Sequence, residues 1–271
     1  MRLDLHNPFV LRSVSPAITD AEGRRVVSLQ RIGKRIVLGL DDDLFIVIHL
    51  MIAGRLRWRP PDKRITGKLA LATLVFPRGA LTLTEAGATR RASIHLVLGT
   101  EALRQFDRGG LEVLGIDRGA FAARLRSENH TLKRALTDPR LFSGIGNAYS
   151  DEILHRARLS PLLLTSRITD DQVDVLHAAV QATLNDWTDR LRREVADGFP
   201  EQVTAFRDGM AVHGRFRLPC PDCGAAVQRI RYASNETNYC ARCQTGGKLL
   251  ADRAMSRLLK EDWPRTIDEL G

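Results

Sequence analysis

The stretch CPDCGAAVQRIRYASNETNYCARC, residues 220–243, contains every cysteine of the chain, as two Cys-X-X-Cys pairs with sixteen residues between them. Each pair can donate two thiolates to one tetrahedral Zn²⁺ while the residues between the pairs form a hairpin. Two disulfides or an unliganded thiol cluster are the alternatives. Because the spacing fits and no cysteine is left over, the sequence predicts one structural zinc ion with the ligands Cys220, Cys223, Cys240 and Cys243.

The residues between the two pairs are polar and partly basic. Arg229 and Arg231 precede a tip that runs from Ser234 to Asn238. Such side chains suit contact with phosphate groups. A solvated turn that binds nothing is the alternative.

A second informative stretch, FSGIGNAYSDE, covers residues 142–152. Gly144 and Gly146 precede Asn147, which can cap a helix, and acidic residues follow in the first turns of that helix. Backbone amides at such a helix start can bind a phosphate. An ordinary junction between two helices has the same pattern, so this stretch alone leaves both interpretations open.

The composition favours a polyanionic partner. Lys and Arg number 41 against 32 Asp and Glu, which gives a net charge of +9 and a pI near 9.9 over 271 residues. Neutralising phosphates releases counterions, so nucleic acid is the leading partner class and an acidic membrane surface the weaker one. No run reaches the roughly 18 apolar residues of a membrane helix, and the start Met1–His6 lacks the apolar core of a secretion signal. We therefore expect a cytosolic, bacterial-type location, where cysteines stay reduced.

Hydrophobic patterning predicts an α+β fold. From Leu3 to about Gly99, short β-rich runs separated by turn signals predict an antiparallel β-sandwich; the runs are 25–30, 35–40, 44–51, 69–76, 81–84 and 94–98. From about Glu101 the pattern becomes helical. Its clearest helix begins at Thr169, which forms a capping box with Gln172, and ends before Gly198.

Taken together in chain order, these motifs resemble the formamidopyrimidine-DNA glycosylase and endonuclease VIII family. The resemblance rests on Gly-Ile-Gly-Asn147 with Tyr149 and Glu152, then His213-Gly-Arg215, then the finger of residues 220–244. It implies a helix-two-turns-helix module in which Asn147 binds a phosphate beside the lesion. The domains expected on this basis are a β-sandwich (1–104), a helix-two-turns-helix domain (105–205), a zinc-finger hairpin (206–245) and an amphipathic tail (246–271).

In the N-terminal half, the resemblance assigns roles to two positions. The segment Arg31 to Arg35 resembles the one that holds a DNA-contacting, catalytically helpful lysine, so Lys34 is the candidate. Ile52, or its neighbour Met51, would be the apolar wedge that fills the gap left by an extruded base. For Lys34 the alternative is an ordinary exposed lysine on a strand. For Ile52 and Met51 the alternative is a buried strand.

Further DNA contacts are expected from the residues Arg90, Arg91, Arg215 and Asn235. Two positions depart from the family pattern. Asn235 replaces an arginine that engages phosphates beside the lesion, which predicts a weaker grip there. Ala92 stands where guanine-lesion enzymes of the family often have Phe in the loop that fills the gap opposite the lesion.

The tail from Lys248 to Lys260 is basic and amphipathic. Leu250, Ala254 and Leu258 share one face of a helix with this spacing. A docked helix is the simpler interpretation, and an additional DNA contact is the alternative.

The expected function is that of a base-excision DNA glycosylase with AP-lyase activity on oxidised bases, acting as a monomer on duplex DNA with damaged bases or abasic sites. Family members open with Met-Pro-Glu, whose proline amine is the nucleophile, and this segment is absent here. We expect a true start upstream that supplies it. The second hypothesis is a non-catalytic damaged-DNA-binding protein of the same fold. The third is an enzyme in which the amine of Lys34 or Met1 is the nucleophile.

Overall fold

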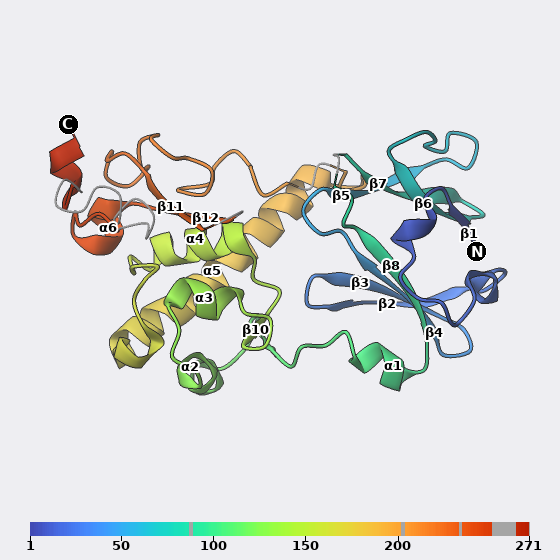
Figure 1. Cartoon of the computed structure of the whole chain (residues 1–271), viewed down its shortest axis with the longest axis horizontal. Coiled ribbons are helices and arrows are strands. Elements are labelled where there is room, and N and C mark those ends of the chain that lie inside the picture. The colour runs from blue at the N-terminus through green and yellow to red at the C-terminus, as the bar shows by residue number, and fades with distance from the viewer. Residues whose placement is uncertain (87–88, 202–203, 233–234, 251–263, 271) are drawn as a thin grey trace. The chain divides into compact units, whose positions relative to one another are not determined.

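The computed structural model describes the chain apart from residues 87–88, 202–203, 233–234, 251–263 and 271, and it divides into two compact units (Figure 1). Unit 1 comprises Met1–Arg108 and Glu194–Val203, and unit 2 comprises Gly109–Arg193 and Thr204–Gly271. Among the described helices, none combines the length and apolar character needed to cross a membrane.

Unit 1 consists mainly of two antiparallel sheets. One has the strand order β1-β6-β7-β5 and the other has the order β2-β3-β4-β8. Their bounds are β1 (Arg2–Leu5), β2 (Val26–Ile32), β3 (Arg35–Leu40), β4 (Leu44–His49), β5 (Gly54–Arg59), β6 (Ala70–Phe76), β7 (Gly79–Glu85) and β8 (Ser93–Leu98). Short 3-10 turns lie at Pro8–Val10 and Ile18–Ala21.

The core of unit 1 lies between the two sheets. Ile46 and Ile48 of one sheet pack in the same fully buried cluster as Leu74 and Leu83 of the other. Burying one such side chain contributes roughly 1.5–3 kcal/mol, so this cluster is what holds the sheets face to face. The outer face of β3 and β4 is covered by Leu103 from α1 (Thr100–Arg104). The predicted N-terminal antiparallel sandwich is confirmed.

Strand β5 carries apolar and basic side chains in strict alternation. Leu56 and Trp58 contribute to the core between the sheets, so the intervening arginines project from the opposite face. There Arg57 donates to Glu201 at 3.1 Å and Arg59 donates through two nitrogens to the same carboxylate. These ion pairs hold Glu201 against strand β5 within unit 1.

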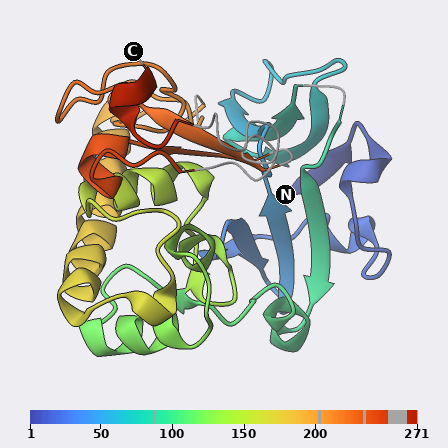
Figure 2. The ribbon, with the colours of Figure 1, turned by 60° about the vertical axis from the view of Figure 1, so that its left-hand side comes forward.

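Helices form the first part of unit 2. They are α2 (Arg118–Arg126), α3 (Leu132–Thr137), α4 (Asn147–Arg156) and α5 (Asp170–Val195), with short strands β9 (Leu111–Glu112) and β10 (Phe142–Ser143) and a 3-10 turn at Thr165–Arg167. Phe121, Leu136 and Ile153 are fully buried in the core that these helices share with α5, the long yellow helix of Figure 2. The capping box that predicts the start of α5 is confirmed: Gln172 N–H donates to Thr169 Oγ1, and Thr169 N–H donates to Gln172 Oε1.

The second part of unit 2 is the finger. Strands β11 (Gln228–Tyr232) and β12 (Asn235–Tyr239) form an antiparallel hairpin, and α6 (Ala241–Thr245) follows. A 3-10 turn occupies Ile267–Leu270. Of the predicted amphipathic tail, Ala254, Leu258, Arg253, Arg257 and Lys260 lie outside the described residues.

Candidate nucleic-acid interface and metal centre

The four cysteines of the finger converge on one point. Their sulfur atoms all lie within 4.8 Å of one another. Cys223 Sγ is 3.4 Å from Cys240 Sγ, and Cys220 Sγ is 3.9 Å from Cys243 Sγ. A tetrahedral zinc ion with Zn–S bonds of about 2.3 Å needs sulfur separations of about 3.8 Å. The residues therefore fit one structural Zn²⁺, as the sequence predicts, and the ion would tie the two ends of the hairpin together.

A histidine of α4 lies directly behind this centre. The imidazole of His155, which is 3 % exposed, has its Nε2 3.3 Å from Cys220 Sγ. An N–H donated to a zinc-bound thiolate offsets part of its negative charge and fixes its orientation. His155 therefore joins the helical part of unit 2 to the metal centre, a role that no sequence pattern indicated.

The start of α4 differs in one detail from the prediction. Gly144 has φ +89°, a conformation that favours glycine, and Gly146 is the N-cap residue. Asn147 is the first helical residue rather than the cap, and its side-chain Nδ2 donates to the carbonyl oxygen of Glu236 at 2.8 Å. The expectation that Asn147 caps the helix was wrong, because Gly146 adopts the extended cap conformation and leaves the Asn147 amide to reach the hairpin.

Glu152, in the second turn of α4, binds three consecutive backbone amides. Its carboxylate accepts from the N–H groups of Ala211 at 2.6 Å, Val212 at 3.0 Å and His213 at 2.9 Å. The side chain is nearly buried. Charge-assisted bonds of this kind are stronger than neutral ones, so Glu152 fixes the segment that leads into the finger.

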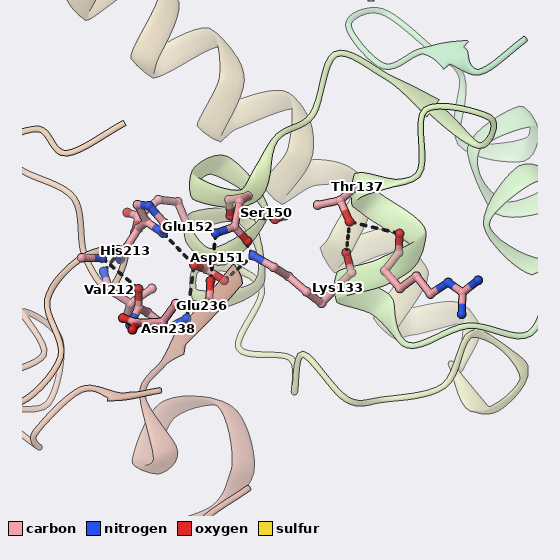
Figure 3. A network of polar contacts seen from close by, with 12 residues as sticks. Lys133, Thr137, Ser150, Asp151, Glu152, Val212, His213, Glu236 and Asn238 are labelled. Atoms are coloured by element: carbon pink, nitrogen blue, oxygen red, sulfur yellow. Dashed lines mark hydrogen bonds and ion pairs between the residues drawn. The ribbon is translucent and has the colours of Figure 1, made fainter. Parts of the chain in front are cut away.

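The neighbouring Asp151 is the centre of a buried polar network (Figure 3). Its Oδ2 accepts from His213 Nδ1 at 2.8 Å and from the Asn238 N–H at 3.2 Å. Its Oδ1 accepts from Lys133 Nζ at 2.5 Å, and Lys133 also donates to the Asn147 carbonyl oxygen at 2.7 Å. This one carboxylate of α4 thus connects α3 to the segment before the first zinc ligand and to strand β12 of the finger.

Lys133 is itself largely withdrawn from water. Burial lowers the pKa of its ammonium group, and the charge of Asp151 and the hydrogen bond to it partly offset that effect. Separating a buried cation from the carboxylate that it contacts is costly. Sequence reasoning missed Lys133, because the partner that makes it notable lies 18 residues further along the chain.

In unit 1, Lys34 lies in the tight turn between β2 and β3 and is exposed. His49 lies opposite Arg35 on the adjacent strand. Burial, then the charges of Arg35 and Lys34, lower the pKa of His49. The imidazole is therefore neutral at pH 7, and its Nδ1 accepts the Met51 N–H at 3.0 Å.

The loop between β4 and β5 presents apolar side chains to solvent. Ile52 is 82 % exposed and Met51 is 44 % exposed. Met51 has φ +53°, which is strained for a side chain of this kind. The alternative of a buried strand at these two positions was wrong, because β4 ends at His49 and β5 begins at Gly54.

The loop between β7 and β8 is anchored from within the sandwich. The buried carboxylate of Glu85 accepts from the N–H groups of Arg91 and Ala92 at 3.0–3.1 Å. The side chains of Arg90 and Arg91 are exposed, and Arg90 donates to the Lys68 carbonyl oxygen. Ala92 is buried in the core, so its side chain does not face solvent.

The remaining predicted DNA contacts belong to unit 2. Arg215 is partly buried, donates from Nη2 to the Pro219 carbonyl oxygen at 3.1 Å, and has no partner for its buried Nε among the described residues. Asn235 is exposed at the first position of β12. Within unit 2, the structure brings Asn147 and the hairpin together, whereas Lys34 and Ile52 belong to unit 1.

Three family profiles match successive parts of the chain. The formamidopyrimidine-DNA glycosylase N-terminal domain matches residues 2–93, and the formamidopyrimidine-DNA glycosylase H2TH domain matches residues 115–190. The zinc finger found in FPG and IleRS matches residues 217–246.

Curated relatives agree with these profiles. The chain is 42 % identical over 151 residues to an uncharacterized formamidopyrimidine-DNA glycosylase-like protein of Mycobacterium tuberculosis, covering 56 % of this chain and 94 % of the relative. It is 35 % identical over 240 residues to the formamidopyrimidine-DNA glycosylase of Thermus thermophilus, covering 84 % and 85 % of the two chains. The Lactococcus lactis Fpg, solved in complex with DNA containing an abasic site, has the same fold with a TM-score of 0.78 at 22 % identity, covering 90 % of this chain and 91 % of that one. The chain therefore belongs to the formamidopyrimidine-DNA glycosylase family.

Proposed function

We propose that this chain is a base-excision DNA glycosylase with AP-lyase activity that acts on oxidised bases in duplex DNA. The observation that carries the proposal is the position of Asn147. Its amide stands at the start of α4, beside a zinc-stabilised hairpin, and buried carboxylates at Asp151 and Glu152 hold both elements in place. Backbone amides at the N-terminus of a helix can bind a phosphate.

Unit 1 supplies features that suit the extrusion of a base. An apolar side chain as exposed as Ile52 gains by entering the stacked bases of a duplex, and this gain offsets part of the cost of unstacking. The positive charges of Arg90 and Arg91 in the exposed loop after β7 suit the DNA backbone. The net charge of +9 favours association with DNA through counterion release.

Lys34 is the candidate residue of this chain for assisting the chemical step. In the third alternative, where Lys34 is itself the nucleophile, its amine would attack the aldehyde carbon C1′ of an abasic sugar, and loss of water would leave a Schiff base. Loss of a proton from C2′ would then expel the 3′ phosphate by β-elimination. The Met1 amine is the other candidate, and it donates to the Arg24 carbonyl oxygen.

We infer the lesion class from a solved relative. The Lactococcus lactis Fpg has been solved with DNA containing Fapy-dG and with DNA containing an oxidised pyrimidine. We propose that this chain takes lesions of the same two classes, as a monomer, in a reducing compartment such as the bacterial cytosol, where the zinc thiolates stay reduced.

The test is borohydride trapping on duplexes that contain an abasic site, 8-oxoguanine or an oxidised pyrimidine, with binding followed in parallel. A covalent complex that disappears in Lys34→Ala and persists in Lys63→Ala, an exposed lysine of the same unit, would support both the activity and the nucleophile. A complex that persists in Lys34→Ala would support the activity and exclude Lys34. Damage-selective binding with no covalent complex would instead favour the non-catalytic alternative.

Asn147 is tested separately, by binding to the abasic duplex. Asn147→Ala should weaken binding about tenfold or more, the cost of one phosphate contact with a fixed donor. Asn185→Ala, an exposed asparagine on α5, is the matched control and should leave binding unchanged. Equal affinities for the two variants would contradict the proposed anchor.

A further inference from the structure

The hairpin of the finger has one basic face, formed by the two arginines for which the sequence leaves phosphate contact and a solvated turn as alternatives. In the register of β11 and β12, Arg229 lies opposite Asn238, and Arg231 lies opposite Glu236. Because alternate residues of a strand share a face, these four side chains lie together. Ile230, between the two arginines, is fully buried on the other face.

Glu236 is the centre of this face. Its carboxylate accepts from Arg229 Nη1 at 3.2 Å, from Arg231 Nε at 3.4 Å and from Asn238 Nδ2 at 2.9 Å. Its backbone carbonyl oxygen accepts the amide of Asn147 at 2.8 Å. A single residue therefore gathers two guanidinium groups and two amides around its oxygen atoms.

These donors are of the kinds that bind a phosphodiester. Guanidinium groups and side-chain amides are the usual protein partners of DNA phosphate oxygens. A carboxylate with two charged oxygens is a close electrostatic substitute for the two free oxygens of a phosphodiester. Since one anion already lies among them, a phosphate can use the arginines only by displacing the carboxylate or by sharing them with it.

We propose that Arg229 and Arg231 form a second phosphate-binding site for the DNA backbone, and that Glu236 occupies this site in the free protein. The proposal rests on the proposed function, because it takes DNA as the ligand. It adds a pair of contacts on β11 to the anchor at Asn147, and it places cationic groups on the same hairpin that carries the uncharged Asn235.

The two arginines have different roles in this site. The guanidinium of Arg229 lies 4.0 Å from the centre of the Phe216 ring, and its side chain is 30 % exposed. Stacking on the ring holds Arg229 in a fixed orientation. Arg231 is 63 % exposed and has no ring contact among the described residues, so only its pairing with Glu236 limits its reorientation toward a phosphate.

Glu236 is charged under the conditions in which DNA binds. Burial alone would raise the pKa of its carboxyl, but the hydrogen bond from Asn238 and the charges of the two arginines lower it. The bond from Asn238 is not an arginine contact, so it can keep the carboxylate near the site after a phosphate arrives. The carboxylate and the phosphate would then repel each other, which lowers the affinity of the wild-type site for DNA.

The experiment measures the dissociation constant for an abasic-site duplex between 50 and 300 mM salt in variants that each replace one residue of the site. Arg231→Gln should weaken binding about 3- to 10-fold and reduce the slope of log K against log salt by about 0.9, one phosphate contact. Arg231→Lys keeps the charge and should keep the slope. Glu236→Gln should tighten binding about 3- to 10-fold, because it releases the arginines and removes the repulsion.

Matched controls have the same charge changes elsewhere. Arg242→Gln alters an exposed arginine of the finger that pairs with Asp268, and Glu101→Gln alters an exposed acid that pairs with Arg104. Both should change the affinity by less than twofold. Zinc content and thermal melting of each variant show whether the finger is intact.

A double variant separates direct action from a general charge effect. If Glu236 acts on the arginines, the increase in DNA affinity caused by Glu236→Gln should be at least halved when Arg231→Gln is also present. Equal gains in both backgrounds would overturn the proposal, and so would a Glu236→Gln variant that binds no better than Glu101→Gln. If the wild-type chain binds no duplex at 50 mM salt, the proposed function fails and the site fails with it.

Discussion

Asp151 Oδ2 and His213 Nδ1 lie 2.8 Å apart, and both side chains are buried. Asp151 comes from the second turn of α4, whereas His213 precedes the first zinc ligand by seven residues. The bond therefore connects the helix that presents Asn147 to the finger that carries the hairpin. The relative position of the amide and the hairpin depends on this connection.

Asp151→Asn should destabilise unit 2 by about 3 kcal/mol, because it leaves the buried Lys133 without its counter-charge. Urea unfolding followed by circular dichroism measures the loss. Asp186→Asn removes an exposed carboxylate that pairs with Arg156 and should cost less than about 1 kcal/mol. If both variants lose the same free energy of unfolding, the Asp151 network contributes no more stability than an ordinary surface ion pair.

Removal of zinc should unfold the finger and leave unit 1 folded. The apolar cluster under the metal, which includes Val212 and Val227, is small and includes the cysteines themselves. Such a core does not hold without its ion. The expected results are one zinc per chain released to a chelator, proteolytic cleavage within 204–250, and loss of DNA binding that returns when zinc is restored. A chelated protein that resists proteolysis in this segment would contradict the prediction.

Ile52→Ala should leave stability within about 0.5 kcal/mol of the wild type, because an exposed side chain buries little area on folding. It should weaken binding to an abasic duplex and reduce the fluorescence of 2-aminopurine placed beside the lesion, a signal of unstacking. Val14→Ala changes a valine that is 97 % exposed and is the control for loss of surface area. Matching fluorescence in the two variants would exclude Ile52 as a wedge.

Asp138 gives a prediction about pH. Its carboxylate accepts from the Arg140 side chain, which lowers the pKa of Asp138 to about 2. A lowered pKa in the fold means that the stabilisation is complete above the unfolded value of about 4 and is lost as the pH falls toward 2.

Asp138→Asn should therefore cost about 1–2 kcal/mol at pH 7, and the difference from the wild type should shrink below pH 4. Urea unfolding of both proteins across this range measures it. Acid releases zinc from both proteins alike, so the difference between them remains the relevant quantity. A cost that stays constant from pH 7 to pH 3 would exclude the ionised carboxylate as its source.

Local sequence patterns predicted much of the fold. The zinc site depends on two short spacings, and the start of α5 depends on Thr169 and Gln172, three residues apart. The predicted runs 35–40 and 44–51 correspond to β3 and β4 within two residues. Strand β5 was missed although its apolar residues Leu56 and Trp58 alternate with arginines. Its many arginines are also typical of an exposed loop, and only the other sheet shows that Leu56 and Trp58 are packed.

The polar network of unit 2 could not be predicted in the same way. Asp151 meets Lys133, His213 and Asn238 at sequence separations of 18, 62 and 87 residues. Only the packed fold brings such positions together. The four-segment domain division and the DNA-contacting roles of Lys34, Ile52, Arg90, Arg91, Asn147, Arg215 and Asn235 stay predictions.

The segment 194–203 belongs to unit 1, although the chain on both sides of it belongs to unit 2. The polypeptide therefore changes unit three times, after Arg108, Arg193 and Val203. A recombination event that transferred only residues 1–108 to another gene would separate Arg57 and Arg59 from the carboxylate of Glu201. Unit 1 is thus completed by a carboxylate that the chain supplies only after α5, and a fragment that ends at Arg108 lacks the partner of two of its arginines.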